Sequence, residues 1–239
     1  MAHTIEFFMA VIFISVWLKQ RNSRSYIDHA FLGMLLGFFC VIRIINIAFF
    51  ILYFVDQLSL LWNSSSKEKI YLKNFFNRSV CLSLSFFLII APQLFVWQKL
   101  NGIPLPIRHF EMASSGLALL SVDFFKKILD VFFSPKWGLL FSFPILIVSV
   151  IGLFLDKQTK DIKLSILTYL ALIVFVVAVY PENSDSYGER HFISAMPLLT
   201  LGLVGALNWS MQNNFRQYSL YCLITFFVTW QYILIVVYK

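Results

Sequence analysis

The sequence predicts an all-α polytopic membrane protein, a bundle of about eight transmembrane helices. Of its 239 residues, 59% are hydrophobic and only 13% are charged, whereas a typical soluble domain has roughly 25% charged residues. The apolar residues also come in long runs, which approach the roughly 20 residues that a helix needs to cross a bilayer. Because a helix satisfies its backbone polar groups internally, helices are the expected form of these runs in lipid.

The apolar runs mark the expected spans. They cover, roughly, residues 4–18, 30–42, 45–62, 79–97, 138–155, 164–180, 192–208 and 219–238. The second and third runs are almost continuous, and one helix over both would be far longer than the bilayer is thick. We therefore expect two short helices that turn at Arg43.

The basic residues lie between the apolar runs and predict the topology. Cytoplasmic loops are enriched in Lys and Arg, and the loops that should face the cytoplasm on this basis are 19–29, 63–78, 156–163 and 209–218. The outer side then receives the turn at Arg43, the long loop 98–137 and loop 181–191. The net charge of +7 follows this distribution and does not indicate binding of nucleic acid. We expect a multi-pass protein of the cell inner (plasma) membrane, with residues 1–239 forming a single integral domain.

The long outer loop 98–137 contains an amphipathic segment at about 115–133. Charged side chains recur there at helical spacing (Asp123, Lys127 and Asp130 among them), and apolar side chains line the opposite face. This pattern predicts a helix that lies in the outer membrane interface.

Neither a metal nor a cofactor is expected from the sequence. The three cysteines, Cys40, Cys81 and Cys222, have no spacing typical of a disulfide framework or a zinc site. His3 and Glu6 lie three residues apart, too short a signal to indicate a metal. No glycine-rich nucleotide loop is present either.

Loop 181–191 (Pro-Glu-Asn-Ser-Asp-Ser-Tyr-Gly-Glu-Arg-His) is the candidate site, because it places many polar groups between two apolar runs. Arg190 offers a planar set of donors that matches phosphate, and His191 and Glu189 can bind sugar hydroxyls or transfer protons. A solvated loop in which Arg190 pairs with Glu182 or Asp185 explains the same residues equally well. Both interpretations stay open on the sequence alone.

Two charged residues fall within the predicted spans. Arg43 lies at the expected turn. It can bind a lipid phosphate of the outer leaflet as part of a functional site, or its long side chain can simply extend to whichever headgroup is near. Asp56 is expected near the inner surface or hydrogen-bonded inside the bundle, rather than in catalysis.

Several segments in order resemble the carboxy-terminal half of bacterial GT-C glycosyltransferases, the multi-spanning enzymes related to protein O-mannosyltransferases and aminoarabinose transferases. They are 97–105 (Trp-Gln-Lys-Leu-Asn-Gly-Ile-Pro-Leu), 133–144 (Phe-Ser-Pro-Lys-Trp-Gly-Leu-Leu-Phe-Ser-Phe-Pro), 151–153 (Ile-Gly-Leu) and 186–199 (Ser-Tyr-Gly-Glu-Arg-His-Phe-Ile-Ser-Ala-Met-Pro-Leu-Leu). Ala2-His3 and the series Gly33, Gly37, Arg43 are similar to the middle spans of that family.

The resemblance implies transfer of a sugar from a polyprenyl-phosphate carrier to a hydroxyl of an outer-face glycan, lipid or protein, with inversion. Arg190 and Arg43 would hold the carrier phosphate, and Tyr187 and His191 would border the sugar pocket. Glu189 is a further candidate for substrate binding. The expected partners are the lipid-linked sugar and membrane lipids.

The family's catalytic acidic motif precedes the matched part, and no carboxylate of this chain matches it. The chain is therefore expected to be the later half of a larger fold, possessing a separately encoded amino-terminal partner or working as a non-catalytic subunit or a truncated remnant. A transporter is disfavoured, because polar residues deep in the spans are scarce.

Overall fold

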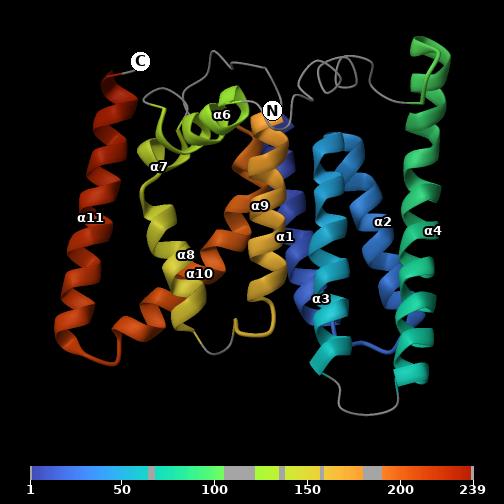
Figure 1. The fold of residues 1–239 in the computed structure, drawn as a ribbon, viewed down its shortest axis with the longest axis horizontal. Coiled ribbons are helices and arrows are strands. Elements are labelled where there is room, and N and C mark those ends of the chain that lie inside the picture. Colours follow the sequence, from blue (N-terminus) through green and yellow to red (C-terminus); the bar gives the residue numbers. More distant parts are fainter. Residues whose placement is uncertain are drawn as a thin grey trace. The chain divides into compact units, whose positions relative to one another are not determined.

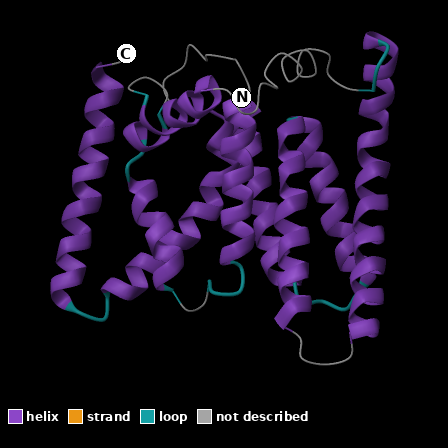
Figure 2. Cartoon of the chain, in the orientation of Figure 1, coloured by secondary structure: helices purple, strands orange, loops and turns teal. Residues whose placement is uncertain are grey.

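The computed structural model describes residues 2–63, 68–104, 122–134, 138–156, 159–179 and 190–237. Every regular element in these ranges is a helix, which confirms the predicted all-α class (Figures 1 and 2). The chain divides into two compact units. Unit 1 comprises Met1–Ser114 and Leu164–Leu172, and unit 2 comprises Ser115–Lys163 and Ile173–Lys239.

The described residues of unit 1 form five α-helices and one 3-10 helix. They are α1 (Ala2–Gln20), α2 (Tyr26–Ile42), η1 (Ile44–Ala48), α3 (Phe49–Asn63), α4 (Glu68–Asn101) and the first half of α9 (Lys163–Val179). Aromatic rings fill its core: the Phe49 ring lies 5.2 Å from that of Phe13, 5.0 Å from that of Phe39 and 4.5 Å from that of Tyr169. All four side chains are fully buried. This core joins α1, α2, α3 and α9 within the unit.

The predicted turn at Arg43 is confirmed. Helix α2 ends at Ile42, Arg43 adopts an extended conformation, and η1 and α3 follow. The buried Asn46 stabilises the break, because its side-chain amide donates a hydrogen bond of 3.2 Å to the carbonyl of Phe39. The same carbonyl also accepts the backbone N–H of Arg43 over 3.3 Å, so Asn46 adds a second donor at the last turn of α2.

Helices α2 and α4 pack at very short range through two glycines of α2. A Cβ atom on Gly33 would overlap the carbonyl oxygen of Leu82, and one on Gly37 would lie 2.7 Å from Cβ of Ile89. Gly33 and Gly37 form a Gly-x-x-x-Gly motif, a pattern that allows close approach of helix backbones in membranes.

Helix α4 is longer at its start than the sequence indicated. The loop expected at 63–78 is helical from Glu68, so the described part of this segment contradicts a loop there. Lys and Arg are good helix formers, and a helix can therefore continue beyond the apolar run. Its other end is set by Gly102, which has a positive φ of 74° and whose N–H donates to the carbonyl of Gln98 over 3.1 Å.

The other helices that the structure describes belong to unit 2. They are α6 (Val122–Phe133), α7 (Leu139–Ser142), α8 (Ile145–Leu155), the second half of α9, η2 (Arg190–Ala195), α10 (Met196–Ser210) and α11 (Asn214–Val237). Helices α8 and α10 cross with their backbones almost in contact. A Cβ atom on Gly152 would overlap the carbonyl oxygen of Gly202, and a Cβ on Gly205 would lie 2.6 Å from the carbonyl oxygen of Gly152. Small residues again set the helix spacing.

The span expected over 138–155 is interrupted. Phe143 and Pro144 separate α7 from α8, because proline has no N–H for a helical hydrogen bond and restricts the residue before it. Trp230 of α11 supports this break, since its indole N–H donates to the carbonyl of Phe141 over 3.1 Å.

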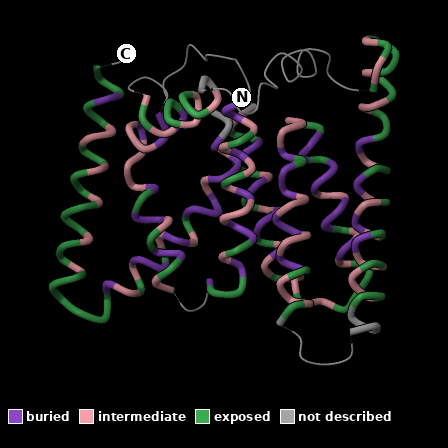
Figure 3. The backbone as a smooth tube through the Cα atoms, in the orientation of Figure 1, coloured by how far each residue is buried: buried purple, intermediate pink, exposed green. Residues whose placement is uncertain are grey.

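Within the described ranges, four helical segments are long and apolar enough to cross a membrane: Ile44–Trp62, Leu72–Asn101, Phe192–Ser210 and Asn214–Val237. Three further apolar helices are shorter, Tyr26–Ile42, Ile145–Leu155 and Lys163–Ala178. Only 6% of the apolar window of α11 is buried (Figure 3), so this helix presents a broad apolar surface. The chain is thus a helical membrane protein.

The expected amphipathic helix is present in part. Helix α6 covers Val122–Phe133, while residues 115–121 lie outside the described ranges. Phe125 and Leu129 are each 58% exposed, and Val131 is buried. The position of α6 at a membrane interface stays a prediction.

Candidate functional site

The five site residues predicted from the sequence differ in what the structure describes. Tyr187 and Glu189 lie outside the described residues. Arg190 and His191 are the first residues of η2, which leads into α10. The side chain of Arg43 is described, and it lies in unit 1 at the end of α2.

Arg43 forms an ion pair with Glu6 of α1. Its Nη1 atom lies 3.1 Å from Oε2 of Glu6, and the two residues are 37 positions apart in the chain. The Glu6 side chain is fully buried, whereas that of Arg43 is 23% exposed. The extended conformation of Arg43, between α2 and η1, lets its long side chain reach α1. A buried carboxylate is thereby neutralised by a guanidinium that keeps access to the surroundings.

His3 completes this group, which we call the Glu6 cluster (His3, Glu6 and Arg43). The Nδ1 atom of His3 lies 3.6 Å from Oε2 of Glu6, one helical turn away on α1. The second carboxylate oxygen, Oε1 of Glu6, is buried and has no hydrogen-bond partner among the described residues. Since buried polar atoms nearly always have a partner, this oxygen is available to a hydroxyl donor.

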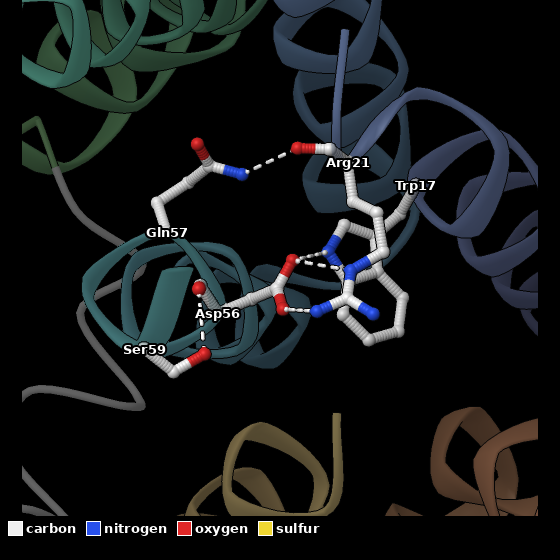
Figure 4. Close-up of polar contacts among 5 residues, drawn as sticks. All are labelled: Trp17, Arg21, Asp56, Gln57 and Ser59. Carbon is white, nitrogen blue, oxygen red and sulfur yellow. Dashed lines mark hydrogen bonds and ion pairs between the residues drawn. The ribbon is translucent and has the colours of Figure 1, made fainter. Parts of the chain in front are cut away.

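A second polar group lies at the other end of unit 1, about 22 Å from Glu6 along α1 at 1.5 Å per residue. We call it the Asp56 cluster (Trp17, Arg21, Asp56 and Gln57; Figure 4). Arg21 approaches Asp56 with Nη2 at 2.5 Å from Oδ1 and Nε at 3.2 Å from Oδ2, a two-point contact. The indole N–H of Trp17 donates to Oδ2 over 3.2 Å, and Gln57 Nε2 donates to the carbonyl of Arg21 over 2.9 Å.

Both oxygens of Asp56 are thus engaged, and the side chain is fully buried. This confirms that Asp56 is hydrogen-bonded inside the bundle. Its role is structural, because its ion pair with Arg21 joins α3 to the end of α1. Removing either partner would leave the other charge buried without compensation.

His29 extends the polar network at the same end. Its Nε2 atom lies 3.2 Å from the carbonyl oxygen of Ser23, and its Nδ1 atom lies 3.1 Å from the hydroxyl of Tyr53. A carbonyl can only accept, so Nε2 carries the proton, and Nδ1 of the neutral ring accepts from Tyr53. These bonds connect the loop before α2 to α3.

The sequence did not indicate the partners in either cluster. Glu6 and Asp56 were each visible as a carboxylate within an apolar run, but nothing local connects them to Arg43 and Arg21. One signal in the sequence could have found them: two carboxylates and two arginines lie in or beside apolar runs, and charges within membrane segments usually pair with one another.

The two clusters differ in what they can do chemically. In the Asp56 cluster both carboxylate oxygens already have donors, whereas the Glu6 cluster has one unbonded carboxylate oxygen beside a partly exposed arginine. Among the residues that the structure describes, no three His, Cys, Asp or Glu side chains come together in a way that could hold a metal ion. The Glu6 cluster is therefore the candidate site.

Comparisons with protein-family models, with curated proteins and with solved structures find no match for this chain.

Proposed function

We propose that this membrane protein binds a polyprenyl-phosphate-linked sugar and acts as a glycosyltransferase, or as the later half of one, at the Glu6 end of unit 1. The observation that supports the proposal is the buried Glu6 carboxylate, which has one oxygen paired with Arg43 and the other without a partner among the described residues. A carboxylate can act as a general base that takes the proton of the acceptor hydroxyl. A guanidinium can stabilise the negative charge of the departing phosphate. The Glu6 cluster holds both groups side by side.

Arg43 would hold the carrier phosphate. Its guanidinium has five N–H donors, and Glu6 is the carboxylate partner seen among the described residues. The remaining donors suit the oxygens of a phosphate, which arginine binds in a planar two-point geometry. Arg190, at the start of η2, is the proposed second phosphate ligand, and Tyr187, Glu189 and His191 are the proposed sugar contacts.

Glu6 would act as the general base. The acceptor oxygen attacks the anomeric carbon, the bond between that carbon and the carrier phosphate oxygen breaks, and the electron pair leaves with the phosphate. The acceptor proton passes to Oε1 of Glu6, for which the described part of the chain supplies no hydrogen-bond partner. Attack opposite to the leaving group inverts the anomeric configuration.

The proposal includes eight crossings of the plasma membrane, with the Glu6 end outside. Three apolar helices of 17, 11 and 17 residues, α2, α8 and α9, would join α1 and the four longer segments as spans. Basic residues at the opposite end of unit 1, such as Arg21, Arg24 and Lys73, support this orientation because they favour the cytoplasmic side.

The test uses the full chain purified into lipid nanodiscs. Retention of polyprenyl phosphate is measured by native mass spectrometry, and transfer is measured with a radiolabelled sugar on that carrier. Arg43→Gln should weaken carrier retention at least about tenfold, and Arg43→Lys should restore part of it. Glu6→Gln should keep retention and abolish transfer. Lys99→Gln is the control: it removes a cation from the last turn of α4, outside the Glu6 cluster, and should change neither carrier retention nor transfer.

Two outcomes would contradict parts of this proposal. Carrier retention by Arg43→Gln equal to that of the unmodified protein would remove the phosphate site. Carrier retention without any transfer, even with native membranes added as a source of a partner, would reduce the chain to a non-catalytic subunit.

A further inference from the structure

A pocket of about 220 Å³, lined by both polar and apolar side chains, lies in unit 1 beside the Asp56 cluster. We call it the arginine pocket. Its lining residues are Arg21, Asn22, Arg24, Gln57, Leu60, Leu61, Asn74, Phe75 and Arg78. They come from the α1–α2 connection, the second half of α3 and the first part of α4, so two helices and one connection form the opening. The pocket is at the end of unit 1 opposite the Glu6 cluster.

The lining carries three arginines and no acidic residue. Asp56, which lies behind the lining, neutralises Arg21. No carboxylate partner is seen for Arg24 or Arg78 in the part of the chain that the structure describes. Two positive charges of this pocket thus have no counter-charge there.

Arg78 makes this excess significant. It lies near the start of the segment Leu72–Asn101 of α4, and its Nε atom is buried with no hydrogen-bond partner among the residues that the structure describes. A buried donor without a partner is costly. An anion in the pocket would satisfy this donor.

The other lining groups indicate what kind of anion. The side chains of Asn22, Gln57 and Asn74 add carboxamide groups, which donate to phosphate oxygens, and Leu60, Leu61 and Phe75 form an apolar wall. The pocket is smaller than the roughly 300–1,000 Å³ of sites that hold drug-sized ligands. It therefore suits a phosphate group with a small or apolar substituent.

We propose that the arginine pocket binds a phosphate monoester through Arg24 and Arg78, with the carboxamides as additional donors. The phosphate can belong to a lipid headgroup or to a small soluble molecule, because both offer the same oxygens. The site is independent of the proposed transferase reaction, since it shares no residue with the Glu6 cluster.

The experiment measures binding of two probes to the purified full chain. Inorganic phosphate is titrated in neutral detergent at constant ionic strength, with the shift in Tm as the readout. Phosphatidic acid is supplied in phosphatidylcholine nanodiscs and its retention is measured by native mass spectrometry. The variants are Arg24→Gln, Arg78→Gln and the double substitution. Lys73→Gln is the matched control, because it removes one charge from the same helix outside the pocket lining.

We expect the double substitution to weaken binding of at least one probe about tenfold or more, while Lys73→Gln stays within about twofold of the unmodified protein. Binding of phosphatidic acid alone would assign the site to a lipid headgroup. Binding of both probes would show that the phosphate group suffices.

The proposal is overturned if the unmodified protein binds neither probe, or if Lys73→Gln weakens binding as much as the double substitution. Arg24→Gln protects the test against misfolding, because Arg24 is exposed and its removal leaves the buried contacts intact. If this single variant binds both probes as the unmodified protein does, Arg24 is not a ligand and the two-arginine site is wrong.

Discussion

Replacing Asp56 by asparagine removes the counter-charge of Arg21 and keeps the shape of the side chain. Asp56 is fully buried and the Arg21 side chain is only 12% exposed, so water cannot replace the missing carboxylate. The asparagine amide would also turn a donor toward either Arg21 or the Trp17 indole, both of which are donors themselves. Loss of one partner from a buried ion pair costs about 3–5 kcal/mol, and we expect Asp56→Asn to lower the free energy of unfolding by that amount.

A double-mutant cycle separates the pair from its surroundings. Arg21→Gln should destabilise the protein similarly, because it leaves Asp56 buried without its cation. The combination Arg21→Gln with Asp56→Asn leaves two neutral groups that can bond to each other. We expect it to lose less than the sum of the single losses, by about 2 kcal/mol, within the range of directly contacting pairs.

The assay is equilibrium unfolding in mixed micelles, with helix content followed by far-UV circular dichroism. Asp130→Asn is the control, because Asp130 is an exposed carboxylate of α6 and its loss should stay within about 0.5 kcal/mol. If Asp56→Asn behaves like this control, or if the two single losses simply add, Asp56 and Arg21 do not act as a buried pair.

Two further predictions use the same unfolding assay. Gly33→Ala should cost about 1–3 kcal/mol by overpacking, because the new Cβ would overlap the carbonyl oxygen of Leu82; a loss no larger than that of Phe38→Ala, at a site that is 53% exposed, would argue against close α2–α4 packing. Trp230→Phe should cost about 1 kcal/mol, because it removes the N–H bond to the carbonyl of Phe141 while keeping a ring against α7; an unchanged free energy would show that this bond does not stabilise the break before Pro144.

The helical elements were largely predictable from the sequence, and the misses have local causes. The turn at Arg43 was predicted because a single helix would have been too long for the bilayer, and the structure breaks the helix at that residue. The start of α4 was missed because basic residues near Lys73 were interpreted as a loop, although Lys and Arg continue a helix well. The interruption at Pro144 was missed because apolar residues continue on both sides of it.

The candidate site was less accessible to sequence reasoning. Of the five predicted residues, only Arg43 has a described side chain, and its partner Glu6 was not predicted. Glu6 and Arg43 are separated by 37 positions in the chain, and Arg21 and Asp56 are separated by 35. No local pattern spans such a distance.

The sequence by itself determined that this chain is a helical membrane protein, where most of its helices lie and where one of them turns. These properties follow from local composition, because lipid requires each segment to satisfy its own backbone hydrogen bonds. Only the tertiary structure decided which buried charges meet and which oxygen lacks a partner. Those contacts depend on the rotation of each helix and on the distance at which it packs, and here glycines such as Gly33 and Gly202 set that distance.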